Sequence, residues 1–325
     1  MVGADVNNNS IMQNSFYTKY NMFVRPDATA MEFWVGDSDS VAEYAELSTF
    51  LTPDRNGVAR LYETIDAAVG SCVASRGDVI HVLPGHTEAL SDATSMLLDV
   101  AGITVRGMGA GAARPTITLD TATTATVAVS AANVTVENMI FTANFADVVA
   151  PFTLTAAGFH LRNCAFQDTA TDMNFVYIVD GSAVASANNG LVVEGCSWIS
   201  PDLVCESMVK LDEDNSDVVV ADNFVQLGVN NNSAALMVVA DGKSVFNLRM
   251  VGNRVFRLNT DTATGGILFH TNQSDNSGIV AHNFAQHADT AAELLLTASS
   301  GLGTFENFAS GVAGASGYVL PARDS

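Results

Sequence analysis

The second half of the sequence repeats one short pattern at intervals of 24 to 32 residues. Each repeat combines a few apolar residues in alternation, then Asn or Gly, then an aromatic residue. Alternation with a period of two residues indicates β-strands rather than helices. One unit of this kind cannot bury its apolar face alone, so neighbouring units have to stack. The seven segments are VTVENMIF (134–141), FHLRNCAF (159–166), LVVEGCSW (191–198), VVVADNF (218–224), LRMVGNRVF (248–256), GIVAHNF (278–284) and GTFENF (303–308).

The length of the repeat distinguishes between the known kinds of repeat fold. A propeller blade needs about 40 to 45 residues, and a leucine-rich repeat needs an L-x-x-L-x-L pattern that this sequence lacks. A coil of three short strands joined by bends fits the observed length, and equivalent strands of successive coils then lie about 4.8 Å apart. The sequence therefore predicts an all-β fold, a right-handed parallel β-helix (solenoid) of about nine or ten coils.

The recurrent Asn or Gly marks a bend in each coil, because both residues tolerate the left-handed backbone region. On this alignment the aromatic residues form one ladder that faces the interior. Cys164 and Cys196 each follow a bend residue directly and are expected to stack as neighbouring core thiols. The bend residues are Asn138, Asn163, Gly195, Asn223, Asn253, Asn283 and Asn307. The predicted ladder consists of Phe141, Phe166, Trp198, Phe224, Phe256, Phe284 and Phe308.

The segment before the repeats has a different organisation. Apolar residues in 61–75 (LYETIDAAVGSCVAS) have helical spacing, which predicts an amphipathic helix there. Such a helix would cover the open edge of the first coil. The predicted division is an N-terminal arm at 1–32, an extended strand and short capping helix at 33–76, the β-helix at 77–310 and a C-terminal tail at 311–325.

Composition excludes several classes of function. Fourteen basic residues against 35 acidic ones give a net charge of −21, which repels phosphate backbones and argues against a nucleic-acid partner. Near the start there is no basic segment followed by an apolar run, so we expect no signal peptide. No window approaches 18 apolar residues, so synthesis in the cytoplasm without membrane insertion is expected. Four cysteines without a CxxC pair and six histidines without H-x-x-x-H spacing indicate free thiols and no zinc site. We expect no cofactor and no metal.

Several stretches carry a resemblance to a known family. The order FWVGDSDS, LTPDRNG, LYETIDAAVG and GDVIHVLPGHTE resembles the opening of pectin-lyase-like right-handed β-helix proteins. RGDVIHVLPGHTEAL, AGITVRGMGAGAARPTITL and SAANVTVENMIFTANFADV are similar to β-helix virion proteins of tailed bacteriophages. The resemblance covers roughly residues 33–310. It implies a virion location and a homotrimer.

The stretch GDVIHVLPGHTEAL (77–90) could be either an active-site loop or a corner of the scaffold. The resemblance places it where the first coil turns. Gly77 and Asp78 then lead into a strand at 79–82, and Pro84–Gly85 make the next bend. We interpret it as a corner.

A glycan-cleaving enzyme would need two carboxylates, about 5 to 9.5 Å apart, on either side of the bond. The candidates are Asp168, Asp172, Asp180 and Glu194, which are expected near the loop side of adjacent coils. With 35 acidic residues, a solvated acidic surface is the competing interpretation and is favoured.

A lyase would instead need carboxylates that bind calcium and a basic residue that takes a proton. Arg162 and Arg254 lie beside bends, where we expect them to face solvent or acids of the next coil. The acidic stretch LDEDNSD (211–217) lacks the Gly and Glu of a calcium loop.

The arm suggests a means of attachment. Its aromatic residues and Met suit an interface, although packing along the side of its own solenoid would explain them too. The candidate virion-anchor residues are Phe16, Tyr17, Tyr20, Met22 and Phe23.

The function expected from the sequence is that of a structural virion protein rather than an enzyme. It would be a decoration, head-fibre or spike protein that binds capsid or tail proteins through its arm, with the capsid surface favoured. The alternative is a glycan-cleaving tail-spike depolymerase whose partner is a host surface glycan.

Overall fold

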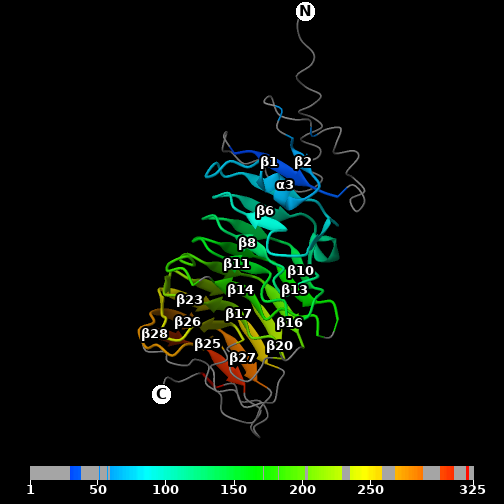
Figure 1. Ribbon diagram of the computed structural model, residues 1–325. Coiled ribbons are helices and arrows are strands. Elements are labelled where there is room, and N and C mark those ends of the chain that lie inside the picture. Colours follow the sequence, from blue (N-terminus) through cyan, green and yellow to red (C-terminus); the bar gives the residue numbers. More distant parts are fainter. Residues whose placement is uncertain are drawn as a thin grey trace, which may run out of the picture.

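The computed structural model describes residues 30–37, 51, 57, 59–170, 172–181, 183–201, 204–228, 235–257, 268–287, 301–310 and 320–321. Within these ranges the chain winds through three sheets again and again, and equivalent strands of successive turns lie side by side (Figure 1). Every neighbouring pair of strands in these sheets is parallel except β29 and β30. The fold is the predicted parallel β-helix.

Sheet 1 contains β2 (Leu61–Tyr62), β1 (Glu32–Val35), β3 (Val79–Val82), β6 (Thr104–Gly107), β9 (Thr135–Glu137), β12 (His160–Arg162), β15 (Val192–Glu194), β19 (Val219–Ala221), β23 (Leu248–Val251), β26 (Gly278–Ala281) and β28 (Leu302–Phe305). Sheet 2 contains β4 (Thr87–Leu90), β7 (Thr116–Leu119), β10 (Ile140–Ala143), β13 (Ala165–Asp168), β16 (Ser197–Ser200), β20 (Phe224–Leu227), β24 (Arg254–Arg257), β27 (Phe284–His287), β29 (Phe308–Ser310) and β30 (Leu320–Pro321).

Sheet 3 contains β5 (Met96–Leu98), β8 (Val127–Val129), β11 (Phe152–Leu154), β14 (Tyr177–Gly181), β17 (Ser207–Leu211), β21 (Met237–Val239) and β25 (Phe269–His270). A separate pair joins β18 (Asn215–Ser216) to β22 (Val245–Phe246). The helical elements are α3 (Ile65–Val69) and the 3₁₀ turn η1 (Gly111–Ala113).

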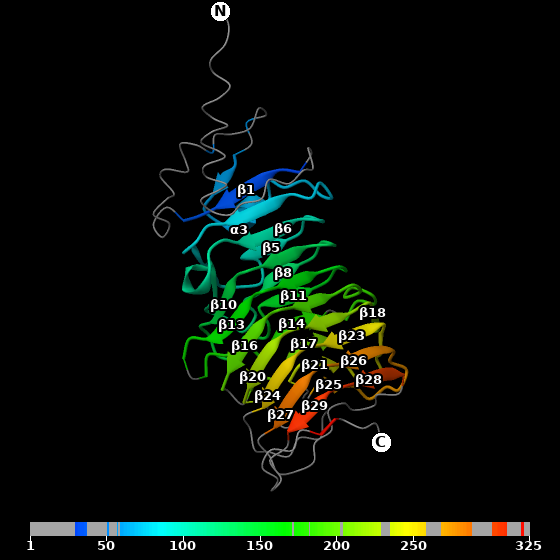
Figure 2. The same cartoon turned by 180° about the vertical axis from the view of Figure 1, so that it is seen from behind.

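The described residues form about seven complete turns, because sheet 3 has seven strands. Each complete turn passes from sheet 1 to sheet 2 to sheet 3, as Figure 2 shows from the opposite side. After β25, two further turns contribute strands to sheets 1 and 2. The prediction of nine or ten coils therefore overestimated the complete turns.

The corner between sheets 1 and 2 corrects the predicted alignment of the repeats. Asn138, Asn163 and Gly195 have the left-handed backbone expected of bend residues, with φ of 59°, 52° and 65°. In the four later repeats that conformation belongs to the residue before the Asn. These residues are Asp222, Gly252, His282 and Glu306. The Asn of each later repeat follows the corner and is buried.

The one-residue shift also divides the predicted aromatic ladder. Phe141, Phe166 and Trp198 pair in register and are buried, so the ladder is confirmed for these three turns. Trp198 then pairs with Val225, not with Phe224, and the ladder prediction is wrong beyond that point. Because side chains alternate between the two faces of a strand, a shift of one residue moves a side chain to the other face. The aromatic residues that point outward are Phe224, Phe256, Phe284 and Phe308.

The cap is shorter than predicted. The helix α3 covers only Ile65–Val69, and Leu61–Tyr62 forms strand β2 instead. Thr64 caps the helix by accepting a hydrogen bond from the N–H of Ala67 at 3.3 Å, and Gly70 ends it. The helix buries its apolar residues in the core at the N-terminal end of the solenoid, where Figure 1 shows it beside β1. The candidate anchor residues, most of the arm and most of the tail lie outside the described residues.

The neighbouring core thiols are confirmed. Cys164 and Cys196 follow the corner in successive turns, both are buried, and neither forms a disulfide. Burial raises the pKa of the Cys196 thiol, and its contact with Cys164 adds to this effect. The Cys196 thiol therefore stays protonated in the interior.

Candidate functional site

The first corner of the solenoid contains a buried carboxylate. Asp78 accepts hydrogen bonds from the Arg76 guanidinium through both oxygens, each at 2.7 Å. It also accepts from the N–H groups of Met31 and Val73, each at 2.8 Å. Burial alone would raise the pKa of Asp78, but these four hydrogen bonds outweigh it and hold the pKa below its usual range. Asp78 is therefore ionised, and its four hydrogen bonds stabilise the corner.

His86 and Glu88 in the same stretch join the first turn to the cap. His86 is buried, and its Nδ1 accepts a hydrogen bond from the N–H of Asp37 at 3.1 Å. Its Nε2 lies 3.3 Å from Oε2 of Glu88. The same Glu88 oxygen accepts from the N–H of Ile65, the first residue of α3, at 3.1 Å. These contacts support the interpretation of GDVIHVLPGHTEAL as a corner.

The four candidate catalytic carboxylates do not come together. Asp168 ends β13 in sheet 2, and Asp172 lies exposed in the loop that follows. Asp180 belongs to β14 in sheet 3, and Glu194 ends β15 in sheet 1. Only Asp168 and Asp172 share a site.

The other two carboxylates are ion-paired. Lys210 Nζ lies 3.0 Å from Asp180 and 3.0 Å from Asp212. Arg162 Nε lies 3.5 Å from Glu194, one turn further along sheet 1, which matches the expectation that Arg162 meets an acid of the next coil. Both pairs lie on the outer surface, where they link adjacent turns.

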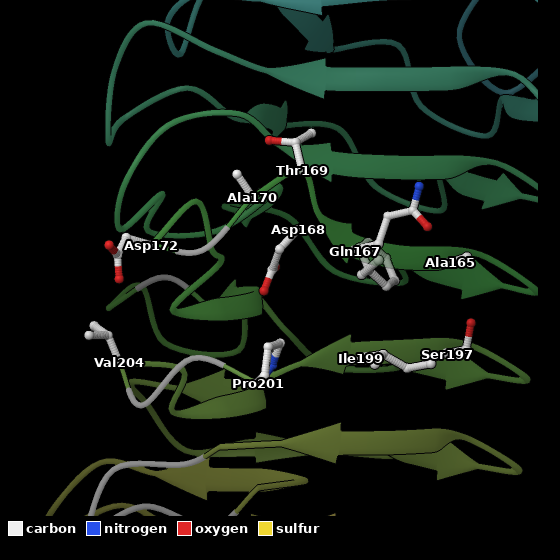
Figure 3. A pocket seen from close by; sticks show the side chains of 11 residues that line it. Ala165, Gln167, Asp168, Thr169, Ala170, Asp172, Ser197, Ile199, Pro201 and Val204 are labelled. Atoms are coloured by element: carbon white, nitrogen blue, oxygen red, sulfur yellow. The ribbon is translucent and has the colours of Figure 1, made fainter.

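Asp168 and Asp172 line a cleft on the outer side of sheet 2. The cleft lies over the turns of β13 and β16 and has a volume of about 910 Å³. Figure 3 shows Asp172 and Val204 at one end of the lining and Ser197 at the other, with Asp168 between them. The lining residues are Ala165, Phe166, Gln167, Asp168, Thr169, Ala170, Asp172, Ser197, Ile199, Pro201 and Val204.

Asp168 is held in place by a buried hydrogen-bond chain. The Cys205 thiol donates to Ser200 Oγ at 2.9 Å, and Ser200 Oγ donates to Asp168 Oδ2. Ser200 and Cys205 are completely buried. The chain fixes the orientation of the Asp168 carboxylate at the cleft wall.

The composition of the cleft limits its chemistry. Carboxylates, an amide and hydroxyl groups can hydrogen-bond a polar ligand, and Ile199, Pro201 and Val204 offer it an apolar surface. This combination fits a neutral polyhydroxylated molecule. The residues that β16 contributes to the lining could not be predicted from the sequence. Which residues of neighbouring turns lie side by side depends on the strand register, and an alternating pattern leaves that register uncertain by one residue.

A second polar cluster lies on sheet 3. The Tyr177 hydroxyl donates to Glu206, and Lys210 Nζ lies 5.2 Å above the Tyr177 ring. Burial is the main cause that raises the pKa of Tyr177, and the nearby carboxylates, Glu206 above all, add to the effect. Burial would lower the pKa of Lys210, but its hydrogen bonds to Asp212 and Asp180 outweigh this and raise it. Lys210 therefore stays charged and cannot act as a general base near neutral pH.

The acidic stretch 211–217 is linked to the following turn. Glu213 pairs with Lys243, and Asp214 accepts from the N–H of Ser244 at 2.7 Å. Across the described ranges, no group of three or more His, Cys, Asp or Glu residues is arranged to hold a metal ion. In the same part of the chain, no helix is long and apolar enough to cross a membrane.

Comparison with known proteins finds no family model, no curated protein and no solved structure that matches the chain. The class is therefore defined by the fold alone. This is a parallel β-helix protein with a cleft on the outer side of sheet 2.

Proposed function

We propose that this protein is a rod-shaped structural component of a tailed-bacteriophage virion, held to the particle by its N-terminal arm. The observation that carries the proposal is the continuous interior. One cluster of buried apolar side chains extends from Phe33 in β1 to Leu302 in β28. A solenoid filled along its whole length is a stiff spacer, because each turn packs on the next.

The placement of the carboxylates supports a structural role. Asp180 and Glu194 lie on sheets 3 and 1, not at the cleft, and their ion pairs connect neighbouring turns. Asp78, His86 and Glu88 are committed to the first corner. These five polar groups thus contribute contacts that stiffen the rod, which leaves Asp168 and Asp172 as the carboxylates at the cleft.

The virion setting is supported by the resemblance of residues 33–310 to phage β-helix proteins. The capsid surface is favoured over the tail, and a decoration or head-fibre protein is the corresponding role. Capsid proteins are the proposed partners, and a homotrimer is the proposed form.

Cryo-electron microscopy of the particle that carries this protein tests the proposal. Density for the solenoid on the capsid lattice is the expected result, and absence from purified particles would contradict it. Deletion of residues 1–30 tests the arm, because it leaves the solenoid and the contacts of Asp78 intact. The shortened chain should fold but no longer join particles, whereas normal incorporation would reject the arm as the anchor.

The cleft favours a second candidate, a glycan-cleaving tail spike. Asp168 and Asp172 would act as the carboxylate pair, with a host surface polysaccharide as substrate. Purified protein should then release reducing ends from that polysaccharide, and Asp168→Asn or Asp172→Asn should abolish the release. Asp180→Asn and Glu194→Gln are the matched controls, since both carboxylates lie on other sheets. Polysaccharide that stays intact with the wild type would remove this candidate.

A further inference from the structure

The cleft on the outer side of sheet 2 carries charge of one sign. Asp168 and Asp172 are the charged residues among the eleven that line it, and none of the eleven is basic. Ser200 donates a hydrogen bond to Asp168 and fixes that carboxylate at the wall, whereas Asp172 is exposed in the following loop. The net charge of −21 adds to the negative potential, and a cleft lined by one sign of charge concentrates that potential. The cleft therefore attracts a cation.

Strand β16 and the residues that follow it give the same cleft an apolar wall. Ile199, Pro201 and Val204 line it, and Ile199 and Val204 are 48% and 42% exposed. Figure 3 places Val204 at the same end of the cleft as Asp172. A ligand that removes such side chains from water gains about 25 cal/mol for each Å² of apolar surface that it covers. The cleft therefore suits a ligand that is partly apolar as well as positively charged.

Other classes of ligand use only part of this lining. A neutral polyhydroxylated molecule can hydrogen-bond with the polar groups, but it leaves both negative charges uncompensated. A calcium ion prefers about six to eight oxygen ligands and would not cover the apolar wall. A guanidinium group gains affinity by stacking on aromatic faces, but Phe166, the aromatic residue of the lining, is only 1% exposed. An ammonium group has no such requirement, because it is a compact charge on a flexible aliphatic stem.

We propose that this cleft binds a primary ammonium group carried on an apolar stem, as in a lysine side chain or a linear alkyl diamine. The ammonium group lies at the end of the cleft that holds Asp172, with the charge of Asp168 close by. The methylene groups of the stem cover Val204, Pro201 and Ile199. The volume of about 910 Å³ leaves room for the rest of the molecule that carries the stem.

The inference goes beyond the proposed virion role and beyond the glycan-cleaving alternative, because it requires neither a particle nor a bond that is cleaved. Its test is a ligand-observed NMR titration of the purified full chain, which measures dissociation constants of weak ligands. The probes are N-acetyl-lysine methylamide and cadaverine, which represent a lysine side chain of a protein and a free diamine. N-acetyl-norleucine methylamide is the neutral control, since it keeps an apolar stem and lacks the ammonium group. Glucose is the control for a neutral polyhydroxylated ligand.

The chain offers matched variants for both halves of the site. Asp172 and Asp147 are exposed carboxylates in loops that follow β13 and β10, and both have a left-handed backbone, with φ of 68° and 54°. Asp172→Asn and Asp147→Asn change the net charge equally, so a difference between them reports the cleft and not the overall charge of the molecule. Ile199 and Ile279 are each 48% exposed, but Ile199 lines the cleft and Ile279 lies on sheet 1. Ile199→Ser and Ile279→Ser therefore test the apolar wall.

We expect the wild type to bind the lysine derivative about tenfold more tightly than the norleucine derivative, and less tightly as ionic strength rises. Asp172→Asn should weaken binding of the lysine derivative about fivefold, and Ile199→Ser about threefold. The two control variants should change it by less than about twofold. Tighter binding of the lysine derivative than of cadaverine would identify a protein side chain as the ligand, and the reverse would identify a free diamine.

Three results would overturn the inference. These are equal binding of the norleucine and lysine derivatives, equal weakening by Asp147→Asn and Asp172→Asn, and glucose binding at least as tight as that of both amines. Absence of the protein from virus particles would contradict the proposed function but would leave these dissociation constants unchanged, so the two failures are distinguishable.

Discussion

The side-chain oxygen of Asn253 accepts two hydrogen bonds from Asn223 in the preceding turn, one from its backbone N–H and one from its side-chain amide, both at 3.0 Å. Asn283 accepts the same pair from Asn253, both at 2.9 Å. Asn307 continues the series by accepting from Asn283. All four side chains are buried. This asparagine ladder satisfies the polar backbone just after the corner, turn by turn.

Replacement of Asn253 by Ala should therefore destabilise the protein strongly. It removes the acceptor of two Asn223 donors and a donor to Asn283, and each buried group left without a partner costs about 1–3 kcal/mol. We expect a loss of about 2–4 kcal/mol in the free energy of unfolding, measured by urea denaturation. The control is Asn144→Ala, an exposed Asn after β10, for which a loss of less than about 1 kcal/mol is expected. Similar losses for the two variants would argue against the ladder as a stabilising element.

A pair of phenylalanines tests the register of sheet 2. Phe166 is buried in the interior between Phe141 and Trp198, so Phe166→Ala should cost about 3–5 kcal/mol. Phe256 is outward-facing and partly exposed, so Phe256→Ala should cost less than half as much. Chemical denaturation of both variants measures the difference. A larger loss for Phe256 would place it in the interior, as the uncorrected ladder had it.

Much of the fold could be predicted because the repeat in the sequence corresponds to one turn of the solenoid. Alternating apolar residues give strands, and unit length gives three strands per turn, as the sheets confirm. The sequence could not say which residue makes each corner, since Asp222 and Asn223 both tolerate a left-handed backbone. Because of this one-residue ambiguity, Phe224, Phe256, Phe284 and Phe308 were predicted to face the interior, whereas they face outward. The cleft was out of reach for a related reason, because Ile199 meets Gln167 only through the pairing of two strands 32 residues apart.

Glu88 tests the structural interpretation of the first corner. Its carboxylate accepts from the N–H of Ile65 and lies beside His86. Glu88→Ala should release the start of α3, so amide hydrogen exchange in Ile65–Val69 should become at least tenfold faster. Exchange in β20, five turns away, should stay unchanged. Unaltered protection of α3 would show that Glu88 does not hold the cap.

The Asp78 carboxylate should make stability depend on pH. Burial alone would raise its pKa, but hydrogen bonds from Arg76, Met31 and Val73 outweigh burial and hold the pKa below the unfolded value of about 3.9. A lowered pKa means that the stabilisation is complete above the unfolded pKa and is lost as pH falls through the folded pKa. Wild type should exceed Asp78→Asn by about 2 kcal/mol at pH 7, and the gap should narrow steadily below about pH 4. Urea unfolding of both proteins at several pH values measures the gap, and Asp99→Asn, which replaces an exposed carboxylate after β5, should show almost none. A gap that widened on acidification would mean that the folded state prefers the protonated acid, contrary to the hydrogen bonds at this corner.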